Sequence, residues 1–379
     1  MAKYSLIPGG VKPGDILTVM LKVTGTDPVT GAAMLECCMP NRDGGEPAPG
    51  LVAIASPAVP LPAQENKVPV SAEIRQGGTR YAHLIEMTRG LEPIRTAVVH
   101  PVDCNSLVGA VAAARAKLIV PILVGPEARI RAAAIQAGVD VSPFELVATQ
   151  HSDASAIEAV AMARAHKVEA LMKGAIHTDE LMHAVVDQEK GLRTARRISH
   201  VFAIDAPRYP RPLFITDAAI NIYPTLTDKR DIVQNAIDLA HALGIAVPCV
   251  AILSAEEMVT ESITSTLDAA ALCKMAERGQ ITGGILDGPL AFDNAVSLEA
   301  AQTKGIVSAV AGRANIFVVP DLEAGNMLAK QLEYLADAHI AGIVLGARVP
   351  IILTSRADKI EARLGSSALA LLLARHVKH

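Results

Sequence analysis

The sequence predicts an α/β fold with two lobes of mainly parallel sheet, a cleft between the lobes and a short N-terminal β segment. Hydrophobic residues make up 51% of the 379 residues and aromatic residues only 3%, so the core must consist of Ala, Val, Leu and Ile. Such a core suits the close packing of helices on a buried parallel sheet. From about residue 65 onward, short apolar runs alternate with helical patterns, which is the order typical of parallel sheets.

The N-terminal segment has a different pattern from the rest of the chain. Apolar and polar residues alternate from Leu17 to Val23, and the alternation repeats from Ala33 to Met39 after the turn sequence DPVTG. This period of two predicts the two strands of a hairpin, and LVAIAS predicts a third short strand. The proline-rich stretch SPAVPLPAQENKVP that follows is typical of a linker.

We therefore expect three parts in the chain: residues 1–60 as the N-terminal segment, residues 61–165 together with 346–379 as the first lobe, and residues 166–345 as the second lobe. In the lobes, the predicted strands carry the sequences TAVVHPVD, PILVGP, FELVAT, EALMKGA, HVFAIDA, PLFITDAA, PCVAILS, GGILDGP, NIFVVPD, GIVLG and VPIIL. The predicted helices include HLIEMTRGL, SLVGAVAAARAK, ASAIEAVAMARAH and KRDIVQNAIDLAHALG. The last of these is expected to be capped near Thr227 and to end at Gly244.

Charge and composition argue against several classes of protein. The net charge of −4 comes without a basic stripe, so no nucleic-acid partner is expected. The longest apolar runs are interrupted by Arg115, Lys117 and Arg348, well short of the ~20 residues that a membrane span needs. Five cysteines form no CxxC motif, which predicts reduced thiols, no metal site and a cytoplasmic location.

Polar residues follow five of the predicted strands, at the point where each strand ends. In open α/β sheets, ligands bind beyond the carboxyl ends of the strands. One such residue taken alone is more often a turn or a helix cap, but together they predict a ligand site in the cleft. The residues are Lys173, Gly174, His177 and Thr178; Asp217; Asp287; Asp321 and Asn326; and Ser355, Arg356 and Asp358.

Several longer stretches that include these strand ends carry a resemblance to a known family. They are HPVDCNSLVGAVAAARAKLIVPILVGP, LMKGAIHTDELMHAV, ITDAAINIYPTLTDKRDIVQNA, GGILDGPLAFDNAVS, ANIFVVPDLEAGNMLAKQLEYL and GIVLGARVPIILTSRAD. In these stretches the sequence resembles the phosphate acetyltransferase and phosphate butyryltransferase family, and the form LTSRAD and the chain length look closer to the butyryl branch. The resemblance implies isocitrate-dehydrogenase-like lobes, a homodimer, and no bound cofactor beyond the substrate coenzyme A. The implied reaction converts acyl-CoA and phosphate to acyl phosphate and CoA; the sequence does not tell the acyl chain length.

The residues after the last strand fit the demands of this chemistry. Arg356 can grip a phosphate with its planar fork, and Ser355 can donate a hydrogen bond to the thiol or the oxyanion, roles that the resemblance also implies. The general base is less clear, since the acid of the acetyl branch falls at Ala362 here. We rank Asp358 first for this role, with Glu361 and Asp287 as alternatives.

The remaining candidates each have a structural alternative. Lys173 can add positive charge for phosphate or CoA, or be a solvated lysine at a turn. His177 follows the LMKGA turn in a segment similar to the family's Gly-x-x-His-Thr, and it can bind a substrate or relay a proton, or be a buried structural histidine. Asp321 and Asn326 can meet CoA, or cap a helix. The arginines of GLRTARRIS and APRYPRP can receive the phosphates of CoA, but a solvated surface is the favoured interpretation. They are Arg193, Arg196, Arg197, Arg208 and Arg211.

Two further resemblances leave alternatives open. The N-terminal stretch GDILTVMLKVTGTDPVTGAAMLECCMPNRDGG resembles the C-terminal strands of a hotdog-fold hydratase of the MaoC type, but the hydratase's Asp/His pair has no counterpart, so no hydratase activity is expected. The two-lobed fold also permits a metal- and NAD(P)-dependent dehydrogenase, in which Asp287, Asp293 and Asp321 would imitate the metal cluster. A non-catalytic CoA-binding or scaffold protein is the third alternative.

Overall fold

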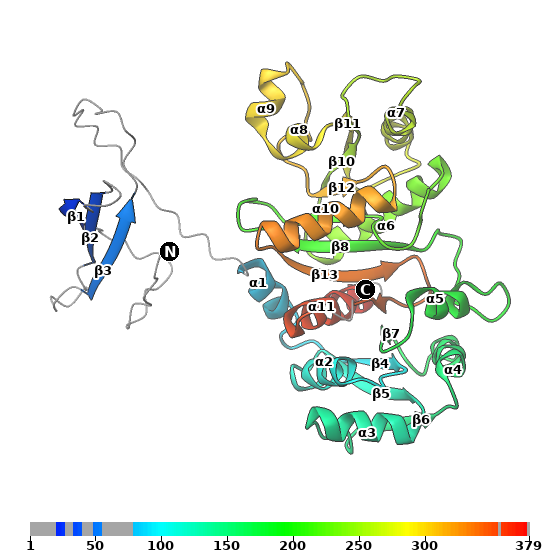
Figure 1. Ribbon diagram of the computed structural model, residues 1–379. Coiled ribbons are helices and arrows are strands. Elements are labelled where there is room, and N and C mark those ends of the chain that lie inside the picture. The colour runs from blue at the N-terminus through cyan, green and yellow to red at the C-terminus, as the bar shows by residue number, and fades with distance from the viewer. Residues whose placement is uncertain (1–19, 27–32, 40–47, 55–78, 355–357, 377–379) are drawn as a thin grey trace. The chain divides into compact units, whose positions relative to one another are not determined.

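The computed structural model describes residues 20–26, 33–39, 48–54, 79–354 and 358–376 (Figure 1). The chain divides into two compact units, Met1–Glu73 and Ile74–His379. In the first unit, β1 (Met20–Thr26), β2 (Ala33–Met39) and β3 (Ala48–Ile54) form an antiparallel sheet in the order β1-β2-β3. The three predicted strands are therefore confirmed, whereas the likeness to a hydratase stays a prediction.

The second unit is built on one sheet of eleven strands in the order β11-β10-β12-β9-β8-β13-β14-β7-β4-β5-β6. Most neighbours are parallel, as predicted, and only β8 and β13 introduce antiparallel pairs. The strands are β4 (Ile94–Val99), β5 (Ile119–Gly125), β6 (Glu145–Ala148), β7 (Ala170–Lys173), β8 (Ser199–Asp205), β9 (Leu213–Thr216), β10 (Cys249–Leu253), β11 (Ile285–Leu290), β12 (Ile316–Val318), β13 (His339–Leu345) and β14 (Ile351–Ile352).

Helices cover both faces of this sheet (Figure 1). One face is covered by α2 (Cys104–Arg115), α3 (Glu127–Ala137), α6 (Leu226–Ala242), α7 (Thr264–Glu277) and α11 (Ile360–His376), whose apolar residues form one continuous core with the strands. The other face has two separate core clusters. The first lies under α4 (Ser152–Arg164) and α5 (Thr178–Val186), and the second under α8 (Phe292–Val296), α9 (Leu298–Thr303) and α10 (Leu322–Leu335).

Sequence patterns account for the buried faces of these elements. In β4, Ile94 and Val98 belong to the continuous core, and Ala97 and Val99 belong to the cluster under α4 and α5. A strand that is buried on both faces reads as an unbroken apolar run, which is why β4 was predictable. In α4, the predicted apolar face is fully buried: Ala156, Ala159, Val160 and Ala163 are 0 to 3% exposed.

Helix α6 begins at Leu226, and its cap lies two residues before the predicted cap at Thr227. The cap is Thr225, because its Oγ1 accepts from the N–H of Asp228 at 3.2 Å while Asp228 Oδ2 accepts from the N–H of Thr225 at 3.0 Å. This reciprocal capping box satisfies donors that the first turn leaves open. The predicted end is confirmed, since Gly244 follows the helix with a φ of 79°.

The division of residues 61–379 into two lobes stays a prediction. One strand, β7, falls in the range predicted for the second lobe but pairs with β4 and β14 of the first. Among the described residues, no helix is both long and apolar enough to cross a membrane.

Candidate functional site

The predicted site residues fall into two groups. The first group follows or ends β14 and β7 and consists of Lys173, Gly174, His177, Thr178, Ser355, Arg356 and Asp358, whereas the second consists of Asp217, Asp321 and Asn326. The chain leaves the sheet after β14 at the first group. Thr354 is buried, and Asp358 lies partly buried two residues before α11 begins. Ser355 and Arg356 lie outside the described residues, so their roles stay predictions. Arg363 of α11 donates a hydrogen bond from Nη1 to Thr354 Oγ1 at 3.0 Å and so fixes the end of the strand.

The neighbouring strand β7 ends at Lys173 and Gly174. Lys173 is only 6% exposed, so the alternative of a solvated lysine is wrong. It pairs in register with Val99 of β4 and lies two residues after Leu171, on the same face of the sheet. Gly174 donates its N–H to Val99 O at 2.9 Å, and a Cβ at this position would lie 2.4 Å from that oxygen. The close approach of β4 and β7 therefore requires glycine here.

Two further residues of the first group lie where α5 begins. His177 is exposed at the N-cap position and makes no side-chain cap hydrogen bond, so the alternative of a buried structural histidine is wrong. Thr178 is the first residue of the helix and is half-buried. An exposed imidazole four residues after a buried lysine can bind an anion or relay a proton.

The second group is centred on Asp217, which follows β9 and is 3% exposed. Its Oδ1 accepts from the N–H groups of Ala219 and Ile220 at 3.0 and 3.1 Å, and its Oδ2 accepts from the N–H and Nδ2 of Asn221 at 3.1 and 2.6 Å. Burial raises the pKa of Asp217, although these donors act in the opposite direction. A carboxylate with this many backbone donors holds a turn in place.

Asp321 and Asn326 attach α10 to this turn. Asp321 caps the helix, since its Oδ1 accepts from the N–H of Ala324 at 2.9 Å; the capping alternative is therefore confirmed. Asn326 donates from Nδ2 to Ala218 O at 3.2 Å. Both residues thus have structural contacts within the second group.

Asp287 lies apart from the second group, in the edge strand β11, where it accepts from the N–H of Gly288 at 2.8 Å. Asp293 pairs with Lys304 at 3.1 Å, and Asp321 is occupied as a cap. Over the described ranges, these aspartates and their neighbours form no group of three side chains that could hold a metal ion.

The two groups lie at opposite ends of the strands of the sheet. Three successive antiparallel pairings, β14 with β13, β13 with β8 and β8 with β9, reverse the direction of β9 relative to β14. One row of the sheet joins Met172, Ile352, Ile343, Val201 and Thr216, so β7 and β9 are four strand spacings apart, or about 19 Å. The sequence could not show this, because it does not give the direction of a strand within a sheet.

The candidate arginines for the phosphates of CoA include two that are paired at the surface. Arg196 pairs with Asp238, and Arg197 donates from Nε to Asn221 Oδ1 at 2.7 Å and lies 3.5 Å from Asp228. Both side chains hold the segment before β8 against α6. These contacts agree with the favoured interpretation of a solvated surface for this part of the arginine set.

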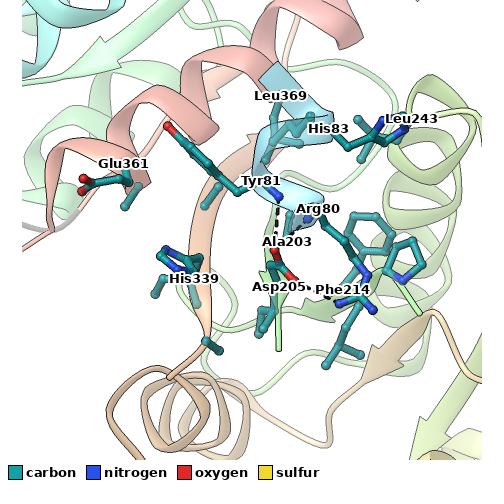
Figure 2. Close-up of a pocket in the computed structure, with 18 of the residues that line it drawn as sticks. Arg80, Tyr81, His83, Ala203, Asp205, Phe214, Leu243, His339, Glu361 and Leu369 are labelled. Atoms are coloured by element: carbon teal, nitrogen blue, oxygen red, sulfur yellow. Dashed lines mark hydrogen bonds and ion pairs between the residues drawn. The ribbon is translucent and has the colours of Figure 1, made fainter. Parts of the chain in front are cut away.

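A pocket of about 330 Å³ lies between α1 (Thr79–Met87), β8, β9, β13 and the start of α11 (Figure 2). Asp205 anchors α1 there: its Oδ2 accepts from the N–H groups of Arg80 and Tyr81 at 3.0 and 3.2 Å, and its Oδ1 accepts from Arg80 Nη1 at 3.0 Å. Burial, with a smaller effect from Glu361, raises the pKa of Tyr81.

Lys359, Glu361 and Ala362, which follow Asp358 at the start of α11, belong to the lining of this pocket. Its deeper wall is apolar and includes Leu213, Phe214, Ile340 and Leu369. A mainly apolar pocket with a polar rim suits a short aliphatic chain. Sequence reasoning missed it, since its walls come from segments that lie more than a hundred residues apart and carry no motif.

Comparisons with known proteins give a consistent result. A family model described as phosphate acetyl/butaryl transferase matches residues 136–371. The chain is 60% identical to a phosphate acetyltransferase of Rhizobium meliloti over 296 residues, which cover 78% of this chain and 94% of the relative. It is 44% identical to a phosphate butyryltransferase of Clostridium acetobutylicum over 253 residues, covering 67% and 84%. A branched-chain phosphotransacylase structure from Enterococcus faecalis V583 matches with a TM-score of 0.66 at 28% identity, covering 74% of this chain and 99% of the other.

Proposed function

The chain belongs to the phosphate acetyl/butyryl transferase family and is an acyltransferase; from this premise we propose that its substrates are acetyl-CoA and inorganic phosphate. The observation that carries the choice of acyl group is the higher identity to the acetyltransferase, 60% against 44% for the butyryltransferase. This weighs against the expectation of the butyryl branch, which rested on the form LTSRAD and on chain length.

In the proposed mechanism, the acyl group moves directly between the two substrates in a ternary complex. A phosphate oxygen attacks the thioester carbonyl carbon, the C–S bond breaks, and the CoA thiolate leaves and takes up a proton. Arg356 holds the phosphate, and Ser355 donates a hydrogen bond to the oxyanion or the departing sulfur. Asp358 supplies the proton as its acid form and removes it in the reverse direction. Holding both substrates together supplies much of the rate, so no acyl-enzyme is needed.

Lys173 and His177 support this assignment by their position. Lys173 ends β7 and His177 follows it, and β7 pairs in parallel with β14, so both residues lie at the same end of the strands as the carboxyl end of β14. The buried ammonium of Lys173, at the carboxyl end of β7, adds positive charge for phosphate or for the pyrophosphate of CoA. We assign Asp217, Asp321 and Asn326 to holding the second group together. We do not assign Asp287 to the role of the base, because its strand β11 is six strand spacings from β14 in the sheet.

Free thiol release tests the proposed function and the acyl group together. The protein is incubated with acetyl-CoA or butyryl-CoA, with and without phosphate, and the thiol is titrated over time. We expect phosphate-dependent release with a kcat/KM about tenfold or more higher for acetyl-CoA, since short acyl groups differ by a few methylenes. Faster turnover of butyryl-CoA would overturn the acyl assignment, and release that ignores phosphate would overturn the reaction.

We further propose that the chain forms a homodimer through the outer face of α10. This helix leaves large apolar side chains uncovered at a helical spacing: Met327 is 59% exposed, Tyr334 68% and Leu335 83%. A helix of a monomer seldom exposes this many large apolar residues on one face. A second copy of the chain is the expected occupant, because the family resemblance implies a dimer.

Replacing Leu335 by lysine is expected to convert the dimer to a monomer, because a desolvated ammonium cannot be accommodated in an apolar interface. The measurement is molar mass by light scattering after size exclusion at micromolar protein. Ile135→Lys is the matched control, since Ile135 on α3 is also 83% exposed. A parent protein that is already monomeric, or a Leu335→Lys variant with unchanged mass, would count against the α10 interface.

We also place the protein in the cytoplasm. The cysteines that the structure describes with their side chains, Cys104, Cys249 and Cys273, are all free thiols. Burial raises the pKa of Cys273 to about 12, which favours the protonated thiol over the reactive thiolate. Free thiols are typical of a reducing compartment.

A further inference from the structure

His100 follows β4 directly and occupies an unusual backbone conformation. Its φ is 56°, in the left-handed region that residues other than glycine seldom adopt. The residue is only 4% exposed. A buried residue in this conformation persists only where its surroundings hold it, so the contacts of the ring show what it is held for.

A set of hydroxyl groups fixes the protonation of the ring. Ser155 Oγ donates its one proton to His151 O at 2.9 Å. The same oxygen therefore accepts in its contacts with Thr149 Oγ1 at 2.7 Å and with His100 Nδ1 at 3.2 Å. This assigns the proton of the neutral imidazole to Nδ1 and leaves the lone pair on Nε2.

The ring is neutral near neutral pH, and its Nε2 is open. Burial lowers the pKa of His100, and the charge of Arg129 adds to this effect. Glu180 acts in the opposite direction, and His151 contributes a smaller lowering. Over the described residues, Nε2 has no hydrogen-bond partner and is not among the fully buried side-chain atoms that lack one. Nε2 is therefore an acceptor that a ligand can reach.

The first group of predicted residues lies beside His100. Strands β4 and β7 are parallel, and Lys173 at the end of β7 pairs with Val99, the residue before His100. His100 O accepts from the N–H of Ala175 at 2.9 Å, and a Cβ at Gly174 would lie 2.9 Å from the same oxygen. Ligands of open α/β sheets bind at such carboxyl ends of strands.

Three helices begin around this ring. Arg129 lies in the first turn of α3, His151 is the N-cap of α4, and Glu180 lies in the first turn of α5. The first turn of a helix carries N–H groups without intrahelical partners and favours anions. At α5 the N-cap His177 makes no side-chain cap hydrogen bond. The surroundings thus supply donors, and His100 adds an acceptor.

We propose that His100 binds inorganic phosphate by accepting, at Nε2, a hydrogen bond from the P–OH group of monohydrogen phosphate. The inference rests on the proposed function, which names phosphate as a substrate. Ammonium, guanidinium and backbone N–H groups only donate, so they hold any tetrahedral dianion. A fixed lone pair accepts the proton that phosphate carries and repels sulfate, which carries none near neutral pH. His100 thereby selects phosphate over sulfate.

Sulfate inhibition of phosphate-dependent thiol release tests this role. In the parent we expect sulfate to compete with phosphate with a Ki about tenfold or more above the KM for phosphate, the scale of one hydrogen bond to a charged group. His100→Asn places an amide nitrogen where Nδ1 lies, tolerates the left-handed backbone and removes Nε2. In this variant the ratio of Ki to KM should fall to about one, because the acceptor that separates the two anions is gone.

This ratio distinguishes binding from structure, because a loosened fold would weaken both anions together and leave the ratio unchanged. His166→Asn is the matched control, since His166 has the same φ of 56° but is exposed after α4. We expect its ratio within about twofold of the parent. A parent that binds sulfate as tightly as phosphate, or a His100→Asn variant with the parent ratio, would overturn the proposal.

Ser155→Ala decides the question if His100→Asn does not fold. It removes the oxygen that accepts from Nδ1, so the ring can turn and the ratio should fall about threefold. Ser367→Ala is its control, because Ser367 is equally buried and its Oγ donates to the carbonyl four residues earlier at 2.8 Å, as Ser155 Oγ does. Equal ratios in the two serine variants would overturn the role of His100. Thiol release that ignores phosphate in the parent would instead overturn the proposed function, so the two failures are distinct.

Discussion

Replacing Arg356 by alanine is expected to lower kcat/KM for phosphate by about 10²- to 10³-fold, mainly through a higher KM for phosphate. A guanidinium can grip two oxygens of an incoming phosphate with its planar fork, and Arg356 is the residue we assign to this role. The KM for acetyl-CoA should change little, because we assign Arg356 to phosphate and not to the thioester. Initial rates of thiol release over a phosphate series measure both constants. Arg356→Lys should recover only part of the loss, since it keeps the charge but not the fork.

Arg348→Ala is the matched control for this result. Arg348 is exposed and precedes β14, at the opposite end of that strand from Thr354, and its removal changes the net charge by the same amount. We expect its phosphate KM to stay within about twofold of the parent, as for an ordinary surface substitution. A parent-like phosphate response of Arg356→Ala would remove this residue from the mechanism. A defect of similar size in Arg348→Ala would point to long-range charge in place of direct contact.

The fold could be predicted largely because its strands are buried on both faces. Runs such as TAVVHP and NIFVVP are short, apolar and flanked by helices, and they became β4 and β12. Strand direction could not be predicted in the same way. The reversal at β8 and β13 depends on which strands become neighbours, and that is set by tertiary packing of segments such as Val201 with Thr216 and Ile343.

Sequence patterns around single residues predicted the structural role of Asp321 but did not predict the burial of Lys173 and Arg363. Asp321 before a helical pattern indicated a cap, and it is one. Lys173 at a strand end gave no sign of burial, because a lysine is normally solvated unless the fold supplies partners for it. Arg363 was passed over although a signal existed: it precedes Ser366 and Ser367 by three and four residues, which places it on the same buried face of α11.

Asp217 occupies the junction between the two core clusters on the face that bears α4, α5 and α10. Ala218 belongs to the cluster under α10, whereas Ala219 and Ile220 pack against the cluster under α4 and α5. The turn that Asp217 holds therefore joins two cores that are otherwise separate on this face. Asn221, which donates to Asp217, also donates from Nδ2 to Ile198 O at 2.9 Å and so connects the segment before β8.

Asp217→Ala is accordingly expected to destabilise the folded second unit by about 3–5 kcal/mol, because it leaves the buried N–H groups of the turn without an acceptor. Asp217→Asn keeps one acceptor oxygen and should cost roughly half as much. Urea unfolding followed by circular dichroism measures the change, a suitable probe for a chain without tryptophan. Asp140→Ala is the control, since Asp140 accepts from the N–H of Ser142 at 2.9 Å in a similar turn at the exposed surface. If Asp217→Ala unfolds at the same urea concentration as Asp140→Ala, the carboxylate is not what joins the two cores, and packing of Ala218 and Ile220 alone must hold the junction.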